Sequence, residues 1–177
     1  MLAAPRTRFA ALERRRQALL AELETLDDAA LSFRPAPGAW SILEVVHHLV
    51  LVEEGVLQAA HDGPGRPRRR KNLRERVGCA AVWLVFKLGL RVKIPTKRVR
   101  PQPGLSLSRL EQEWAASRTS LEAYLDSTRA SMPSETMFRH PIGGPMNVEQ
   151  TLLFLTRHFD HHRRQISRIR RSGAFPV

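Results

Sequence analysis

The stretch SILEVVHHLVLVEEGV, residues 41–56, contains both the start of a helix and an apolar stripe along it. Ser41 and Glu44 have the spacing of a capping box, in which each side chain accepts a hydrogen bond from the other residue's backbone N–H. At about 100° per residue, five apolar side chains fall on one face: Ile42, Val45, Leu49, Val52 and Val56. The stretch therefore predicts an amphipathic helix that begins at Ser41 and ends at the Gly63–Gly65 turn.

Three further segments have the composition and the end signals of helices, and they cover about residues 7–26, 108–129 and 147–171. The first is rich in Ala, Leu, Glu and Arg, which are good helix formers. Ser108 and Glu111 are spaced as a capping box at the start of the segment 108–129. Asn147 is the expected cap of the last helix, and Gly173 is its expected stop. No segment predicts a strand, so the sequence predicts an all-α fold, a four-helix bundle.

Length and composition indicate a globular protein. The chain has 177 residues, of which 42% are hydrophobic, and this predicts a single domain over residues 1–177 with a real core. Cys79 is the only cysteine, so no disulfide forms within the chain. The start, MLAAPRTRFAALERRR, carries charge where a secretory signal is apolar. The longest apolar run, residues 77–90, is shorter than the roughly 20 residues of a membrane span. We expect a cytoplasmic protein.

The positive charge is concentrated in one segment. Residues 66–100 contain 13 Lys and Arg but a single acid, Glu75, and the rest of the chain is neutral overall. We expect this segment to be an insertion between the second and third helices, with its apolar middle forming a shorter helix over the bundle. Its basic ends would be a solvated cover, would recruit an anionic substrate, or would bind nucleic acid or an anionic membrane, helped by Trp83 and Phe86.

Histidines interrupt the apolar faces of two predicted helices. His158 and His162 lie four residues apart, hence one turn apart, on the face of the last helix formed by Val148, Thr151, Leu155, Phe159, Ile166 and Ile169. His161 lies about 100° off that face. In the helix that begins at Ser41, His48 lies at the edge of the apolar stripe, and His47 is expected to face solvent.

Inward-facing imidazoles need polar partners, because a buried ring nitrogen without one is costly. A shared metal ion would satisfy His158 and His162 together, and neutral imidazole is a ligand for zinc, nickel, copper and iron. The alternative is that each histidine is a hydrogen-bonded core residue. His48 would be the third ligand if the second and fourth helices touch at the same height, which spacing alone does not decide.

Two motifs carry a resemblance to a known family. The run WSILEVVHHL, residues 40–49, follows the lead-in PAPG and resembles the pattern Pro-Gly-x-Trp-Ser, a few residues, then His-Leu. The run HFDHHRRQI, residues 158–166, resembles the pattern His-x-x-x-His-Arg-x-Gln. Together, over about residues 20–169, they resemble the DinB/YfiT-like family.

The resemblance implies a four-helix bundle with a divalent metal ion held by His48, His158 and His162 and with open positions for water. Zinc, nickel and iron are the expected metals. Relatives include thiol-dependent S-transferases and isomerases that use mycothiol or bacillithiol, so the resemblance implies a metal-dependent enzyme of thiol-transferase or hydrolase type. The substrate would be a small molecule, anionic if the basic insertion recruits it, with a low-molecular-weight thiol as cosubstrate. The sequence leaves the oligomeric state open, with a homodimer as one alternative, since dimers are common for such bundles.

Two alternatives to this enzyme stay open. In the first, the chain is a non-catalytic, metal-stabilised binding protein whose basic insertion engages nucleic acid or a membrane surface. In the second, it is a stress-linked protein with a degenerate site. Gln165, near the face of His162, would orient a ligand or would be a surface amide. Asp160 points away from the histidines, and Glu53 and Glu54 are expected to be exposed charges rather than a general base.

Three other side chains have structural interpretations. Trp40 is expected to pack against the core at the start of its helix. Trp114 and Tyr124 are expected to pack inside the bundle. Cys79 is expected to be a buried, inert cysteine, with a thiolate stabilised by nearby positive charge as the alternative.

Overall fold

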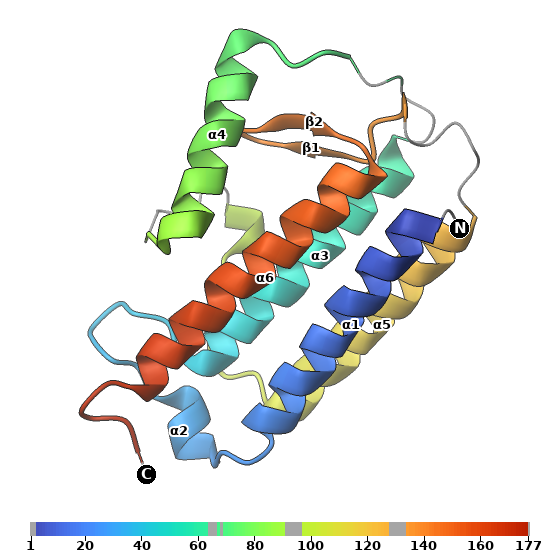
Figure 1. Ribbon diagram of the computed structural model, residues 1–177. Coiled ribbons are helices and arrows are strands. Elements are labelled where there is room, and N and C mark those ends of the chain that lie inside the picture. The colour runs from blue at the N-terminus through green and yellow to red at the C-terminus, as the bar shows by residue number, and fades with distance from the viewer. Residues whose placement is uncertain (1–2, 64–66, 68, 91–96, 128–133, 177) are drawn as a thin grey trace.

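The computed structural model describes residues 3–63, 67, 69–90, 97–127 and 134–176. Its four long helices are α1 (Ala3–Leu23), α3 (Ile42–Asp62), α5 (Leu107–Asp126) and α6 (Val148–Arg170). Each long helix packs on two others: α3 on α5 and α6, and α1 on α5 and α6 (Figure 1). The predicted all-α four-helix bundle is confirmed.

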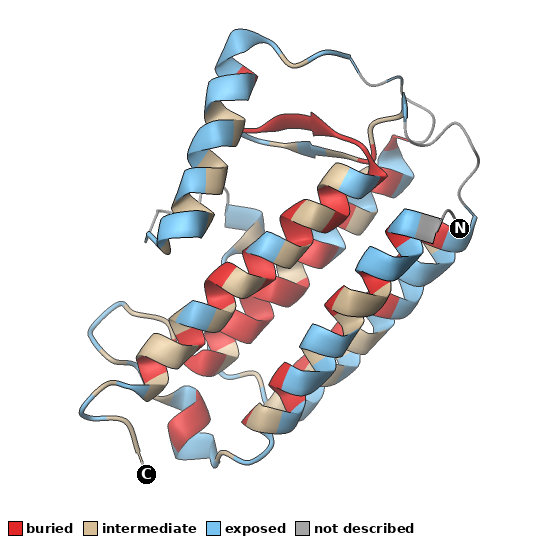
Figure 2. Ribbon diagram, in the orientation of Figure 1, coloured by how far each residue is buried: buried red, intermediate tan, exposed pale blue. Residues whose placement is uncertain are grey.

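The core lies between the four long helices. Buried residues follow the inner side of each helix, and exposed residues follow the outer side (Figure 2). The largest fully buried side chains come from all four helices and from the strand that precedes α6. They are Leu12, Leu19, Leu23, Ile42, Leu49, Leu110, Trp114, Leu125, Met146, Leu152, Leu155 and Ile166. Tyr124 is partly buried against this core, so the packing expected of Trp114 and Tyr124 is found.

Side-chain caps fix where the helices begin. At α3, the Glu44 N–H donates to Ser41 Oγ at 3.2 Å and the Ser41 N–H donates to Glu44 Oε2 at 2.9 Å. Asn147 and Gln150 form the same reciprocal pair at α6. The capping box predicted for α5 is wrong, because Ser106 is the N-cap and accepts from the Arg109 N–H at 3.3 Å. The earlier start adds Leu107 to the first turn, where it packs against the core.

The connection between α3 and α5 carries the insertion. These two helices run in the same direction, so the chain must return along the bundle between them (Figure 1). The return path contains α4 (Leu73–Leu88) and a short 3-10 helix, η1 (Lys97–Val99), and α4 packs on α6. The predicted shorter helix over the bundle is confirmed. Arg66 and Arg68 lie outside the described residues, as does Arg129, the predicted end of α5.

Besides η1, two short features were not predicted. They are the helix α2 (Asp28–Ser32) and a hairpin of β1 (Phe138–His140) and β2 (Gly144–Met146), where a loop was expected. The hairpin packs against α4 through β2. The Glu75 side chain of α4 lies so close to Gly144 that a Cβ atom at this position would be 2.7 Å from Glu75 Cδ. Gly144 also has φ +72°, which favours glycine. Among the described residues, no helix combines the length and apolar character needed to cross a bilayer.

Candidate metal centre

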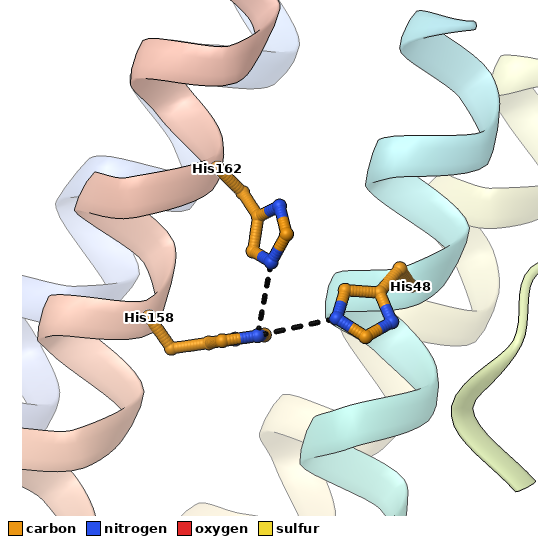
Figure 3. A group of neighbouring side chains, drawn as sticks. All are labelled: His48, His158 and His162. Atoms are coloured by element: carbon orange, nitrogen blue, oxygen red, sulfur yellow. Dashed lines mark hydrogen bonds between the residues drawn. The ribbon is translucent and has the colours of Figure 1, made fainter. Parts of the chain in front are cut away.

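Three histidines from two helices meet inside the bundle (Figure 3). His48 comes from α3, and His158 and His162 lie one turn apart on α6. His158 Nε2 lies 3.2 Å from His48 Nε2 and 3.1 Å from His162 Nε2. One ring nitrogen of each residue lies within 4.8 Å of the other two, and their side chains are only 5–7% exposed. The helical wheels therefore identified the right three residues as a group that could hold a metal ion.

Outer contacts fix the tautomers of two of these rings. His48 Nδ1 lies 2.7 Å from the Val99 carbonyl oxygen, which only accepts, so Nδ1 carries the proton. His162 Nδ1 lies 2.9 Å from Gln165 Oε1, which assigns its proton in the same way. The Nε2 atoms of His48 and His162 therefore carry lone pairs instead of protons, and both lone pairs point toward His158 Nε2. That residue's Nε2–H can satisfy at most one of them.

This donor set fits a transition-metal ion. At least one inward lone pair has no proton to accept, and a bound cation would satisfy all three Nε2 atoms at once. The pattern of a ring N–H held by a carbonyl or amide oxygen, with the other nitrogen free, is typical of metal-ligating histidines. Imidazole nitrogens suit zinc, nickel or iron, whereas magnesium and calcium prefer oxygen ligands.

The three imidazoles are neutral at neutral pH, as metal ligands must be. Burial lowers the pKa of His48, although the hydrogen bond to the Val99 carbonyl opposes this shift. Burial lowers the pKa of His158 and of His162 still further, and each ring is also disfavoured as a cation by its histidine neighbours. Their lone pairs are therefore available without a proton having to leave.

Aromatic side chains form two walls of the centre. The Trp40 ring lies 5.0 Å from the His48 ring and 6.4 Å from the His162 ring, measured between centroids. Phe86 of α4 lies 5.8 Å from the His158 ring. Trp40 does pack against the core as expected, and it also covers the histidines. Both side chains are only partly buried themselves, while the three histidines behind them are buried.

Two neighbouring histidines are more buried than the wheels indicated. His47, expected to face solvent, is 6% exposed, and its Nδ1 accepts the Gln102 N–H at 3.1 Å. That expectation is wrong because the return path after α4 covers this side of α3. His161 lies off the ligand face as expected, yet it is 7% exposed because Phe86 covers it, with ring centroids 5.5 Å apart.

The acids near the histidines are engaged elsewhere. Glu53 is 4% exposed and forms a two-point ion pair with Arg118 of α5, so its prediction as an exposed charge is wrong. Glu54 is exposed as predicted. Asp160 pairs with Arg15 of α1, in agreement with its predicted outward direction. Among the described residues, the only group of three or more potential metal ligands is therefore the one made of histidines.

Gln165 and Cys79 complete the predicted candidates. Gln165 contacts His162 directly, so it orients a ring of the centre rather than lying on the surface. Cys79, expected to be buried, is partly exposed in α4, and Lys71 Nζ lies 3.5 Å from its sulfur. The difference arises because α4 has only one side against the bundle.

Sequence reasoning missed His140 altogether. Its Nδ1 accepts backbone N–H groups from Ile142 at 3.1 Å and from Gly143 at 2.9 Å, which closes the β1–β2 turn. Its ring lies 5.1 Å from the Phe154 ring of α6. The available signal was a histidine three residues before a Gly-Gly pair. It has meaning only if a hairpin is expected there.

We predict that the metal-free protein loses stability in mild acid. Burial lowers the pKa of His140 and of His161 to about 4, from an ordinary value of 6.5. Between pH 6.5 and 4 the unfolded chain therefore binds protons that the folded chain does not, so stability is complete above pH 6.5 and falls as the pH falls. Two histidines that each titrate about 2.5 pH units lower in the folded chain correspond to roughly 7 kcal/mol, so urea unfolding at a series of pH values should show a loss of several kcal/mol. A profile that is flat or rises toward pH 4 would contradict this.

Comparison with known proteins agrees with the motifs and with the fold. The family model described as the DinB superfamily matches residues 11–166, which include all three histidines and most of the bundle. Searches of curated proteins and of solved structures gave no match. Because the family model spans most of the chain, the protein belongs to the DinB superfamily.

Proposed function

We propose that this protein is a metal-dependent enzyme in which His48, His158 and His162 hold a divalent transition-metal ion, and in which a thiol or a water molecule is the nucleophile. The observation that carries the proposal is the convergence of three neutral Nε2 atoms, two of them lone pairs by tautomer, in a pocket without a carboxylate ligand. Three protein ligands leave further coordination positions open, which is typical of catalytic rather than structural sites.

Each protein group has a defined part in this proposal. A bound metal ion would act as a Lewis acid that lowers the pKa of a thiol or water ligand. The Val99 carbonyl holds the His48 ring, and Gln165 holds the His162 ring, so both lone pairs keep a fixed direction. Trp40 and Phe86 exclude bulk water from the rings, which strengthens electrostatic interactions inside the pocket.

A groove beside the centre supports a small anionic substrate. It has a volume of about 580 Å³ and lies between α4 and α6. Its lining includes Trp83, Leu84, Phe86, Lys87, Arg157 and Asp160, and the Asp160 carboxylate is paired with Arg15. Phe86 lines this groove and also contacts the His158 ring, so a ligand in the groove would lie against the side chain that covers the centre. The two cations favour a carboxylate, while the aromatic rings favour an apolar part. A low-molecular-weight thiol that carries carboxylates has this chemistry.

The proposal covers two reaction classes that differ in the nucleophile. In thiol transfer, the sulfur of the thiol forms a bond to an electrophilic carbon of the second substrate, and the leaving group departs with its bonding electrons. The proton of the thiol goes to solvent or to the leaving group. In hydrolysis, the oxygen of water forms the bond to the electrophilic carbon. The leaving group again departs with its bonding electrons, and the proton of water goes to solvent or to the leaving group. No carboxylate base is needed if the nucleophile is already ionised.

The test begins with elemental analysis of protein purified without a histidine tag. We expect about one transition-metal ion per chain and its loss in His158→Ala. The metal-loaded protein is then assayed with a panel of low-molecular-weight thiols and alkylating acceptors, and with ester and amide substrates. His61→Ala is the matched control, because His61 lies exposed on α3, outside the centre.

Gln165→Leu separates orientation of a ligand from its presence. Without the amide oxygen, His162 loses the partner that fixes its tautomer, and metal affinity should fall roughly 10- to 100-fold. Full metal occupancy without turnover of any thiol or hydrolytic substrate would contradict the enzyme and support a non-catalytic, metal-stabilised protein. No metal bound, and none taken up at neutral pH, would contradict the site itself.

A further inference from the structure

The insertion helix α4 has apolar side chains on two opposite sides. A surface helix of a globular protein normally has one apolar stripe, which faces the core. On α4, the stripe that faces the core contains Phe86, which packs on Phe154 of α6 with ring centroids 5.9 Å apart. At about 100° per residue, four more apolar side chains lie within about 60° of one another on the other side. We name them the outer α4 face: Leu73, Val77, Leu84 and Leu88.

The outer α4 face is exposed, and of its four side chains Leu84 also lines the groove between α4 and α6. Leu73 is 75% exposed, Val77 62%, Leu84 52% and Leu88 58%. The other large apolar side chains that are exposed in the described part of the chain are Leu90, just after α4, and Ile142, in the hairpin turn against Gly78. All exposed large apolar groups therefore gather in one region, and such a cluster marks an interaction site.

Basic side chains flank this apolar face. On the helical wheel, Arg74 lies beyond one edge, and Arg76 and Lys87 lie beyond the other. Glu75, the only acid of residues 66–100, points to the hairpin, where Arg69 and Arg139 neutralise it. The flanking cations are therefore exposed beside the leucines, and α4 itself carries no acid other than Glu75 to offset them.

We propose that the outer α4 face docks the protein on an anionic membrane surface. An apolar stripe bordered by Arg and Lys is the pattern of a helix that lies in the plane of the interface, with its apolar side chains among the acyl chains and its cations at the headgroups. The long stems of Arg74 and Arg76 would let their charges reach the headgroups while Val77 and Leu84 insert. Because α4 stands on the outside of the bundle, beside α6 (Figure 1), docking through its outer face would leave the four long helices in water.

Charge and polarity favour this occupant over two others. A second copy placed face to face on the outer α4 face would bring the same cations together, which is unfavourable. Nucleic acid would satisfy the cations but would leave the four apolar side chains against phosphates and water. The residues that carry the docking also differ from those expected from the sequence. Trp83 is partly buried under Arg157, and Phe86 contacts His158, so neither is available.

Sedimentation with vesicles tests the proposal on the full chain. Wild-type protein should bind vesicles that contain phosphatidylglycerol and should not bind pure phosphatidylcholine. The variant Val77→Asn/Leu84→Gln keeps the charge and should bind the vesicles at least roughly tenfold more weakly than wild type. The variant Arg74→Gln/Arg76→Gln keeps the apolar face and should also bind the vesicles at least roughly tenfold more weakly than wild type. All four positions are exposed, so the bundle should fold normally.

Two controls make the result specific. Arg8→Gln/Arg14→Gln removes two exposed charges from α1 and should bind as wild type does. His48→Ala should also bind as wild type, so docking is tested independently of the metal centre. Equal binding by wild type and Val77→Asn/Leu84→Gln would overturn the proposal. So would binding to duplex DNA or RNA without binding to vesicles, or a solution dimer that the same variant abolishes.

Discussion

Replacing Arg118 with methionine should lower the free energy of unfolding by about 3–5 kcal/mol. Arg118 donates to both oxygens of Glu53, from Nε at 2.7 Å and from a terminal nitrogen at 2.8 Å, and the two side chains are only 3% and 4% exposed. Methionine fills similar space but leaves the Glu53 carboxylate buried without its counterion. For a chain of this size, urea or thermal unfolding should show a fall in Tm of roughly 6–20 °C.

Two companion variants show whether the buried charge is the cause. Glu53→Leu/Arg118→Met removes both charges and should recover most of the lost stability, because two apolar groups need no partner. Arg6→Met removes one end of an exposed pair with Asp126, whose atoms lie 3.6 Å apart, and should cost less than about 1 kcal/mol. If the double variant is as unstable as Arg118→Met, the loss arises from packing and not from an unpaired carboxylate.

Metal should raise the thermal stability of the protein, and chelation should reverse the effect. A ligand that binds only the folded state at 100 times its Kd adds about 2.7 kcal/mol, which is roughly 5–11 °C in Tm for a chain of this size. The reason for expecting folded-state binding is that three buried histidines converge while at least one of their inward lone pairs has no proton to accept. The measurement is a melting curve of chelator-treated protein with and without zinc or nickel.

The same melting curves identify the binding residues. His158→Ala removes the central nitrogen, and its Tm should not respond to metal. His61→Ala should respond as wild type does, since His61 contacts Tyr124 rather than the centre. A metal-dependent shift that persists in His158→Ala would place the bound metal elsewhere on the chain.

Features that depend on one helix alone were predictable from the sequence. Apolar periodicity and the caps at Ser41 and Asn147 identified α3 and α6, and the same periodicity turned His48, His158 and His162 inward. Each of these inferences needs only the geometry of a helix and the preference of apolar side chains for the core. The DinB motifs supported the same three residues independently.

Features that depend on a second segment were not predictable in the same way. His47 and His161 are buried because the connection between α3 and α5 lies over them, and Glu53 is buried because Arg118 reaches it from α5. A helical wheel assigns every residue off the apolar face to solvent, so it cannot anticipate such coverage. The hairpin was missed for a related reason: its strands have three residues each, too few for an alternating pattern.

The long connection between α3 and α5 also determines the stage of folding at which the three histidines can come together. His48 and His158 are 110 residues apart, so their rings meet only after α3 and α6 have docked around a large closed loop. Until then a metal ion meets only the single-turn pair His158 and His162. A metal ion bound at the three histidines would therefore slow unfolding rather than speed folding. A shortage of metal in the cell would shorten the lifetime of the finished protein while leaving its production unchanged.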